Sequence, residues 1–169
     1  GDEKRMMSHS ERPADDEVEF AFKTYTNMLF KLCFTILGNA ADAEDAVSDT
    51  MLRYMTKSPP FENEEHKKAW LITVATNICR SVCRFRIRRQ CVNIDDIREL
   101  AANEKDAGIL EEVMSLPPKY KTVLHLHYIE GYRIKEISKM LSLTESAVKK
   151  RLQYARQSLK IKYGKEQGL

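Results

Sequence analysis

The sequence predicts an all-α protein made of two small helical domains joined by an acidic linker, the C-terminal one a helix-turn-helix. Three observations support this prediction. Apolar residues recur at helical spacing over most of the chain, without the period-two alternation of strands. Glycine, proline and N-cap residues divide these periodic stretches into separate helices. The charge also changes sign in blocks along the chain, which indicates two units with different surfaces.

Length and composition limit the class of protein. A chain of 169 residues with 43% hydrophobic residues can form one ordinary domain or two small ones. The N-terminus is charged and lacks the apolar stretch of a signal peptide. No run approaches the roughly 18 apolar residues that a membrane-spanning helix needs. We therefore expect a cytoplasmic protein without direct membrane insertion.

The predicted organisation has four parts. Residues 1–15 are polar and unpatterned and are expected to form a flexible N-terminus. A first helical domain covers 16–91, and an acidic linker covers 92–107. The second helical domain then covers 108–163.

Three helices are expected in the first domain. The first runs from about Val18 to Leu37 and ends at Gly38-Asn39. Its apolar stripe is Phe22, Tyr25, Leu29, Leu32, Cys33 and Ile36. The second begins with Asp42 at its N-cap and stops before Pro59-Pro60. Its buried face is Ala43, Ala46, Val47, Thr50, Met51 and Tyr54.

The third helix, from about Glu65 to Arg89, combines an apolar stripe with a basic end. The stripe is Leu71, Ala75, Ile78, Val82 and Phe85. Residues 63–92 carry 7 basic and 2 acidic side chains, and 116–169 carry 12 and 4. The acidic segment 93–115 separates them, with 2 basic and 7 acidic side chains. This alternation predicts two surfaces that face a polyanion.

The second domain contains the pattern of a DNA-binding helix-turn-helix. A short helix from Ile134 to Leu141 is followed by a three-residue turn and a helix from Glu145 to about Lys162. Thr144 is predicted as the N-cap of this last helix. In such motifs the second helix enters the major groove, and its early exposed residues reach base edges. The candidates for base readout are Ser146, Lys149, Lys150 and Gln153, with Arg133, Tyr154 and Arg156 as further DNA contacts.

No catalytic, metal or cofactor site is predicted. Cys79 and Cys83 lie one helical turn apart, but no histidine follows at ligand spacing, so reduced core cysteines are expected. Asp45 and Asp49 share a helix face and could be read as metal carboxylates. No second helix offers matching ligands, and no nucleophile motif or phosphate loop is present. The sequence therefore favours a binding protein over an enzyme.

Three segments resemble the sigma-70 family of bacterial RNA polymerase sigma factors. LPPKYKTVLHLHYIEGYRIKEISKMLSLTESAVKKRLQYARQSLK (116–160) resembles the domain that binds the promoter −35 element. DAEDAVSDTMLRYM (42–55) resembles the helix that binds core polymerase, and AWLITVATNICRSVCRFRIRR (69–89) resembles the −10-element helix. Their order and spacing are similar to those of the two-domain extracytoplasmic-function (ECF) class.

The resemblance implies a promoter-specificity subunit with three sets of contacts. It implies that Phe61, Asn77, Arg80 and Arg84 contact the −10 element of promoter DNA. It also implies that Asp42, Asp45, Asp49, Leu52 and Met55 dock on the coiled coil of the largest subunit of core RNA polymerase. Phe61 is either a stacking platform for an unstacked base or a hydrophobic plug, and Trp70 is expected to pack in the core. The family usually has an inhibitory anti-sigma factor, often membrane-anchored.

A stand-alone helix-turn-helix repressor or activator is the alternative interpretation. In that case the N-terminal domain would serve dimerisation or sensing, and the chain would bind an operator tightly without polymerase. The second basic helix, from about Glu65 to Arg89, follows an acidic helix, and this arrangement argues against a stand-alone regulator.

Overall fold

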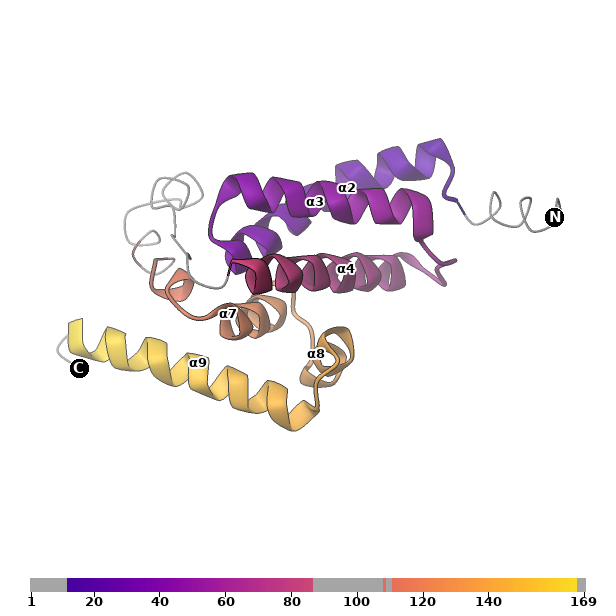
Figure 1. Cartoon of the computed structure of the whole chain (residues 1–169). Helices are drawn as coiled ribbons and strands as arrows, with labels where there is room; N and C mark the ends of the chain where they lie inside the picture. Colours follow the sequence, from indigo (N-terminus) through magenta and orange to yellow (C-terminus); the bar gives the residue numbers. More distant parts are fainter. Residues whose placement is uncertain (1–11, 87–107, 109–110, 167–169) are drawn as a thin grey trace.

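The computed structural model describes residues 12–86, 108 and 111–166, with side chains described as far as Lys160. Every regular element in these ranges is helical, so the predicted all-α class is confirmed (Figure 1). The helices are α2 (Asp15–Leu37), α3 (Ala40–Lys57), α4 (Glu64–Phe85), α7 (Pro118–Leu124), η1 (His125–Ile129), α8 (Ile134–Leu141) and α9 (Glu145–Glu166). The predicted linker lies outside the described residues, as does most of the predicted flexible N-terminus. None of the described helices is long and apolar enough to cross a bilayer.

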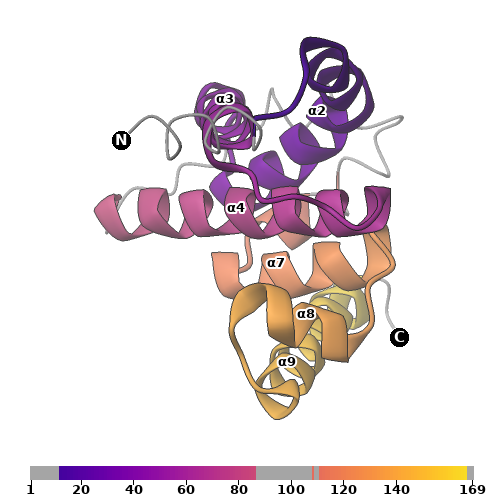
Figure 2. The same cartoon turned by 90° about the vertical axis from the view of Figure 1, so that its right-hand side faces the viewer.

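Helices α2, α3 and α4 pack together as an N-terminal unit around the predicted apolar stripes. Two stripe residues were predicted wrongly. Phe22 is 40% exposed because the neighbouring Ala21 takes the inward position. Phe85 is 90% exposed because it ends α4, where that helix extends past its packing partners (Figure 2).

The ends of these helices are fixed by local hydrogen bonds. Gly38 adopts a left-handed conformation (φ 82°) and closes α2 by donating to the carbonyl of Phe34. The prediction that Asp42 caps the next helix is wrong. Asn39 is the N-cap of α3, and its side chain accepts from the Asp42 amide at 2.9 Å. Asn63 caps α4 in the same way by accepting from His66.

The C-terminal unit contains the predicted helix-turn-helix in α8 and α9. Ser142 ends α8 in the left-handed region (φ 54°), where the motif often carries glycine. Thr144 accepts from the Ala147 amide at 3.0 Å, which confirms it as the N-cap of α9. The sequence did not predict that α7 continues into one π-helical turn, η1, which brings the Tyr132 amide to the Leu126 carbonyl.

The two units pack directly against each other. α7 lies on α2, and α8 lies on α4, so the apolar core is continuous through the molecule (Figure 2). Polar contacts also cross this boundary. Thr35 of α2 hydrogen-bonds His125 at 3.1 Å, and Lys68 of α4 forms an ion pair with Glu130 at 3.3 Å. The sequence analysis treated the units as separate and predicted none of these contacts.

Candidate nucleic-acid interface

One face of α9 is free for contact with another molecule. Ser146, Lys149, Lys150 and Gln153 are exposed there, and no other described residue forms a hydrogen bond or ion pair with these side chains. We call these four residues the reading face. Val148, Leu152 and Ala155 are buried on the opposite side and fix the orientation of the helix. The reading face therefore presents cationic and amide groups of the kind that bind base edges and phosphates.

The two remaining α9 candidates lie elsewhere. Tyr154 stacks on Tyr120 of α7, with ring centroids 4.4 Å apart. Arg156 donates a hydrogen bond to the Tyr128 hydroxyl, and its guanidinium lies 5.4 Å from the Tyr128 ring centre. Both side chains thus contact the α7–η1 segment. The sequence analysis named both as further DNA contacts beside the four candidates for base readout, and it did not predict their aromatic partners.

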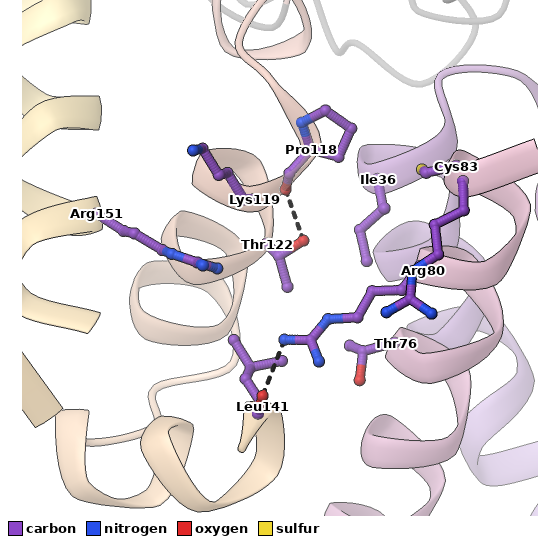
Figure 3. A pocket seen from close by; sticks show the side chains of 10 residues that line it. Ile36, Thr76, Arg80, Cys83, Pro118, Lys119, Thr122, Leu141 and Arg151 are labelled. Atoms are coloured by element: carbon purple, nitrogen blue, oxygen red, sulfur yellow. Dashed lines mark hydrogen bonds between the residues drawn. The ribbon is translucent and has the colours of Figure 1, made fainter. Parts of the chain in front are cut away.

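The candidate −10 residues of α4 share one face but differ in accessibility. Asn77 and Arg84 are exposed. Arg80 is half-buried, and its Nη2 donates to the Leu141 carbonyl at the end of α8 at 3.0 Å (Figure 3). Burial lowers the pKa of Arg80, and the positive charges of Arg151 and Arg84 lower it further. The helix-turn-helix unit therefore covers part of this face.

Phe61 belongs to an aromatic cluster in the loop before α4. Its ring centre lies 5.4 Å from His66, 5.6 Å from Trp70 and 6.4 Å from Tyr54. Phe61 and Trp70 are both partly buried. The contact with buried Tyr54 agrees with the plug interpretation, while Phe61 is not fully buried, so a role in stacking is still possible in this arrangement.

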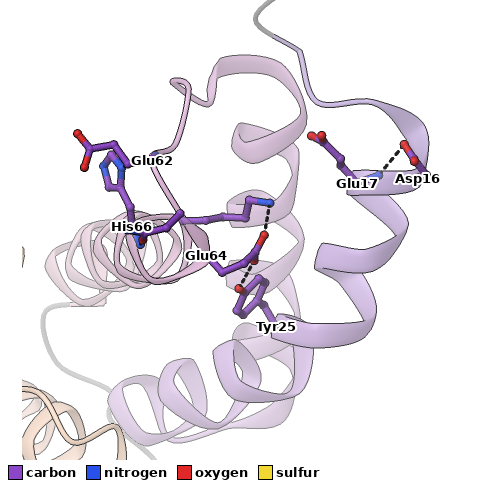
Figure 4. A network of polar contacts seen from close by, with 8 residues as sticks. Asp16, Glu17, Tyr25, Glu62, Glu64 and His66 are labelled. Atoms are coloured by element: carbon purple, nitrogen blue, oxygen red, sulfur yellow. Dashed lines mark hydrogen bonds and ion pairs between the residues drawn. The ribbon is translucent and has the colours of Figure 1, made fainter.

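A polar network holds the start of α4, and with it this loop, against α2 (Figure 4). The Tyr25 hydroxyl donates to Glu64 at 2.5 Å, and Lys67 pairs with the same carboxylate at 3.1 Å. The hydrogen bond from Tyr25, followed by that from Lys67, lowers the pKa of Glu64. Burial and the neighbouring carboxylate raise the pKa of Tyr25. The sequence analysis named Tyr25 only as part of an apolar stripe and did not predict this network, because Tyr25 and Glu64 are far apart in the chain.

The candidate polymerase-docking residues of α3 form an exposed stripe, but the residues at its two ends contact other parts of the protein. Asp45, Asp49 and Leu52 are exposed, and Leu52 retains 54% of its accessible surface. We call these three residues the docking stripe. Asp42 forms an ion pair with Arg86, the C-cap residue of α4, and Met55 packs partly against the core. An apolar side chain flanked by carboxylates suits a protein partner better than DNA.

Two of the cysteines lie in the core, and Cys83 is only partly buried. Cys33 and Cys79 are fully buried, and a hydrogen bond with Cys33 together with burial raises the pKa of Cys79. Cys91 is outside the described residues. Within the described ranges, no group of three or more His, Cys, Asp or Glu side chains could hold a metal ion.

The fold defines an all-α protein with a basic helix-turn-helix, of the kind used in transcription. Comparison with known families gives two matches, in this order along the chain. Residues 21–90 match sigma-70 region 2, and residues 107–159 match sigma-70 region 4. The chain therefore belongs to the sigma-70 family, in the ECF class of RNA polymerase sigma factors.

Individual relatives agree with this assignment. The chain is 26% identical over 180 positions to ECF sigma factor SigW of Bacillus subtilis (strain 168), covering 93% of this chain and 94% of SigW. It is 26% identical over 168 positions to ECF sigma factor BldN of Streptomyces coelicolor, covering 90% of this chain and 63% of BldN. The sigma factor RpoE from Bartonella quintana, solved in complex with the anti-sigma factor NepR, has a similar fold. It superposes with a TM-score of 0.68 at 18% identity, over 85% of this chain and 94% of RpoE.

Proposed function

We propose that this protein is a promoter-specificity subunit that binds core RNA polymerase, recognises −35 and −10 elements and supports DNA opening. The observation that carries the proposal is the order of sigma-70 region 2 and region 4 on one short chain. In this role the chain acts in the cytoplasm by binding and contributes no catalytic group of its own.

The contacts divide among three surfaces. The reading face of α9 reads the −35 element, with Arg133 on the adjacent backbone. Asn77, Arg80, Arg84 and the Phe61 loop handle the −10 element, where an aromatic side chain can capture an unstacked base. The docking stripe on α3 binds the coiled coil of the polymerase's largest subunit. Asp42 and Met55 lie at its ends, and Asp42 must first leave Arg86.

An anti-sigma factor is the second partner of the proposed function. The RpoE chain with a similar fold was solved with the anti-sigma factor NepR. We extend that type of partner to this chain. A pull-down with the full chain as bait would identify this partner and show whether it is anchored in a membrane.

Run-off transcription from a randomised promoter library tests the main proposal. The chain mixed with core polymerase should select templates that share two elements, whereas neither component alone should do so. Gel filtration provides a second test, since the chain and core polymerase should elute as one complex. Failure to form the complex would contradict the proposal.

The stand-alone regulator finds no support in these comparisons. A stand-alone regulator would not be expected to match sigma-70 region 2 across residues 21–90. Tight operator binding by the purified chain without polymerase would be needed to revive it.

A further inference from the structure

A cavity of about 220 Å³ lies between the two units, at the boundary of α4 with α7, α8 and α9 (Figure 3). Its polar lining is cationic. Arg80 and Arg84 come from α4, Lys119 comes from α7 and Arg151 comes from α9. No aspartate or glutamate is among the lining residues. The remaining wall consists of Ile36, Thr76, Cys83, Pro118, Thr122 and Leu141.

The positive charges are held close together by the packing of the two units. Arg80 and Arg151 extend toward the gap from opposite sides, one from each unit (Figure 3). The bond from Arg80 to the Leu141 carbonyl uses one of its five N–H donors and leaves the other four for a ligand. Burial is the main cause of the lowered pKa of Arg80, and the positive charges of Arg151 and Arg84 lower it further. A further positive charge is near, because Lys121 interacts electrostatically with the lining residue Cys83.

Such an arrangement is costly unless an anion occupies it, since like charges in a partly desolvated site repel each other. Three of the four cations are arginines, whose planar forks match the paired oxygens of phosphate. The cavity is smaller than the roughly 300–1,000 Å³ typical of drug-sized ligands. It suits one or two phosphate groups, and it is too small for a DNA duplex.

We propose that this cavity is a binding site for a small phosphate-bearing anion, with a diphosphate as the best match to four positive charges. The anion would be held by Arg80 and Arg151 from opposite units, with Arg84 and Lys119 at the rim. Because its ligands come from both units, binding would stabilise the packed arrangement. It would also occupy Arg80, which belongs to the proposed −10 contacts. The binding itself does not depend on the proposed function.

Isothermal titration of the full chain with inorganic pyrophosphate tests the proposal. Phosphate, ADP and sulfate at matched ionic strength provide the comparison. Pyrophosphate should bind saturably at one site and more tightly than phosphate. If ADP binds as tightly as pyrophosphate, the cavity accepts the diphosphate group of a nucleotide. If ADP binds more weakly than pyrophosphate, the site is one for free pyrophosphate. Sulfate binding as tight as that of pyrophosphate would overturn the proposal, because it would reveal only a non-selective positive surface.

Variants locate the site. Arg80→Gln and Arg151→Gln should each weaken pyrophosphate binding about tenfold or more, since each removes a charge-assisted contact. Arg53→Gln is the matched control, because Arg53 is exposed on α3 and is not among the lining residues. Exposed Lys119 allows a further variant, Lys119→Gln, that should fold even if the arginine variants do not. The proposal is wrong if pyrophosphate gives no saturable heat, or if Arg53→Gln weakens binding as much as the cavity variants do.

Discussion

At the scale of single residues, the most unusual side chain is that of Lys121. It is only 2% exposed on α7, and within the described residues it forms no ion pair with a carboxylate. Burial lowers the pKa of Lys121 to about 8, with a small opposing effect from Cys83. The unfolded chain would hold the same proton up to about pH 10.5. Below pH 8 the native protein therefore contains a buried positive charge that opposes folding.

Lys121→Met should stabilise the protein at pH 7, because methionine keeps the apolar stem and removes the amine. A pKa difference between 10.5 and about 8 corresponds to a gain on the order of 3 kcal/mol. The unfolded wild-type chain binds more protons than the native protein between pH 8 and 10.5, so wild-type stability rises there. The advantage of the variant should shrink over the same range. Urea unfolding followed by circular dichroism measures it, with exposed Lys139→Met as control. An advantage that stays constant between pH 8 and 10.5 would contradict this prediction, because it would show that burial does not lower the pKa of Lys121.

The reading face allows a second prediction about single side chains. Gln153 is exposed and free to form paired hydrogen bonds with a base, whereas Arg156 is held by Tyr128. In holoenzyme bound to promoter variants, Gln153→Ala should lower discrimination at one −35 position by about 1–3 kcal/mol. Arg156→Ala should weaken binding to all sequences alike. A fluorescence anisotropy series over single-base variants measures both. A loss of affinity in Arg156→Ala that depends on the base sequence would contradict this prediction, because it would mean that Arg156 takes part in base readout.

At the scale of helices, the sequence was a good guide because its signals are local. Apolar spacing predicted α3, α8 and α9 closely, and Gly38 and Thr144 marked helix ends that the structure contains. Errors arose where a choice between neighbours depended on packing. Asn39 and Asp42 are both good N-caps, and only the backbone shows that Asn39 takes the role. The candidate site followed the same rule, since spacing predicted the faces but not the partners of Asp42, Tyr154 and Arg156.

The docking stripe on α3 is a property of one helix face and can be tested as such. Leu52→Glu should lower affinity for core polymerase about tenfold or more, because a central apolar contact is replaced by a charge. The fold should be unaffected, since Leu52 is 54% exposed. Arg53→Gln, one position along the same helix, is the control. Surface plasmon resonance with immobilised core polymerase gives both affinities. Equal affinity for Leu52→Glu and the wild type would move the polymerase contact to another surface.

At the scale of the whole molecule, the packing of the two units was beyond sequence reasoning. Each contact joins residues far apart in the chain, such as Thr35 with His125 and Arg80 with Leu141. No local pattern encodes such pairs, and the change in charge sign along the chain pointed toward separated units. The packed form has a functional consequence. The C-terminal unit covers part of the α4 face and binds Arg80. The α4 face must therefore be uncovered, and Arg80 released, before the proposed −10 contacts can form.

The ion pair between Lys68 and Glu130 offers a way to open this boundary. Both side chains are partly buried, at 28% and 10% exposure, and Glu130 is also close to His125. The nearby His125, whose Nε2 lies 3.8 Å from the carboxylate, and the ion pair with Lys68 lower the pKa of Glu130, so its carboxylate is charged at neutral pH. Lys68→Glu would place a second carboxylate opposite it, and repulsion in a partly desolvated site should separate the units. Small-angle X-ray scattering should then show a larger radius of gyration.

The freed chain should also bind duplex DNA better. If the binding-competent open form is a minor population in the wild type, raising that population raises the apparent affinity by the same factor. We expect Lys68→Glu to increase affinity for a −35 duplex by about tenfold, in spite of its added negative charge. The double variant Lys68→Glu, Glu130→Lys recreates an ion pair with reversed polarity and should recover much of the compact form and of the weak DNA binding. Anisotropy and scattering on the same samples link the two effects. If Lys68→Glu expands the molecule without a gain in DNA affinity, the packed arrangement does not limit access to DNA.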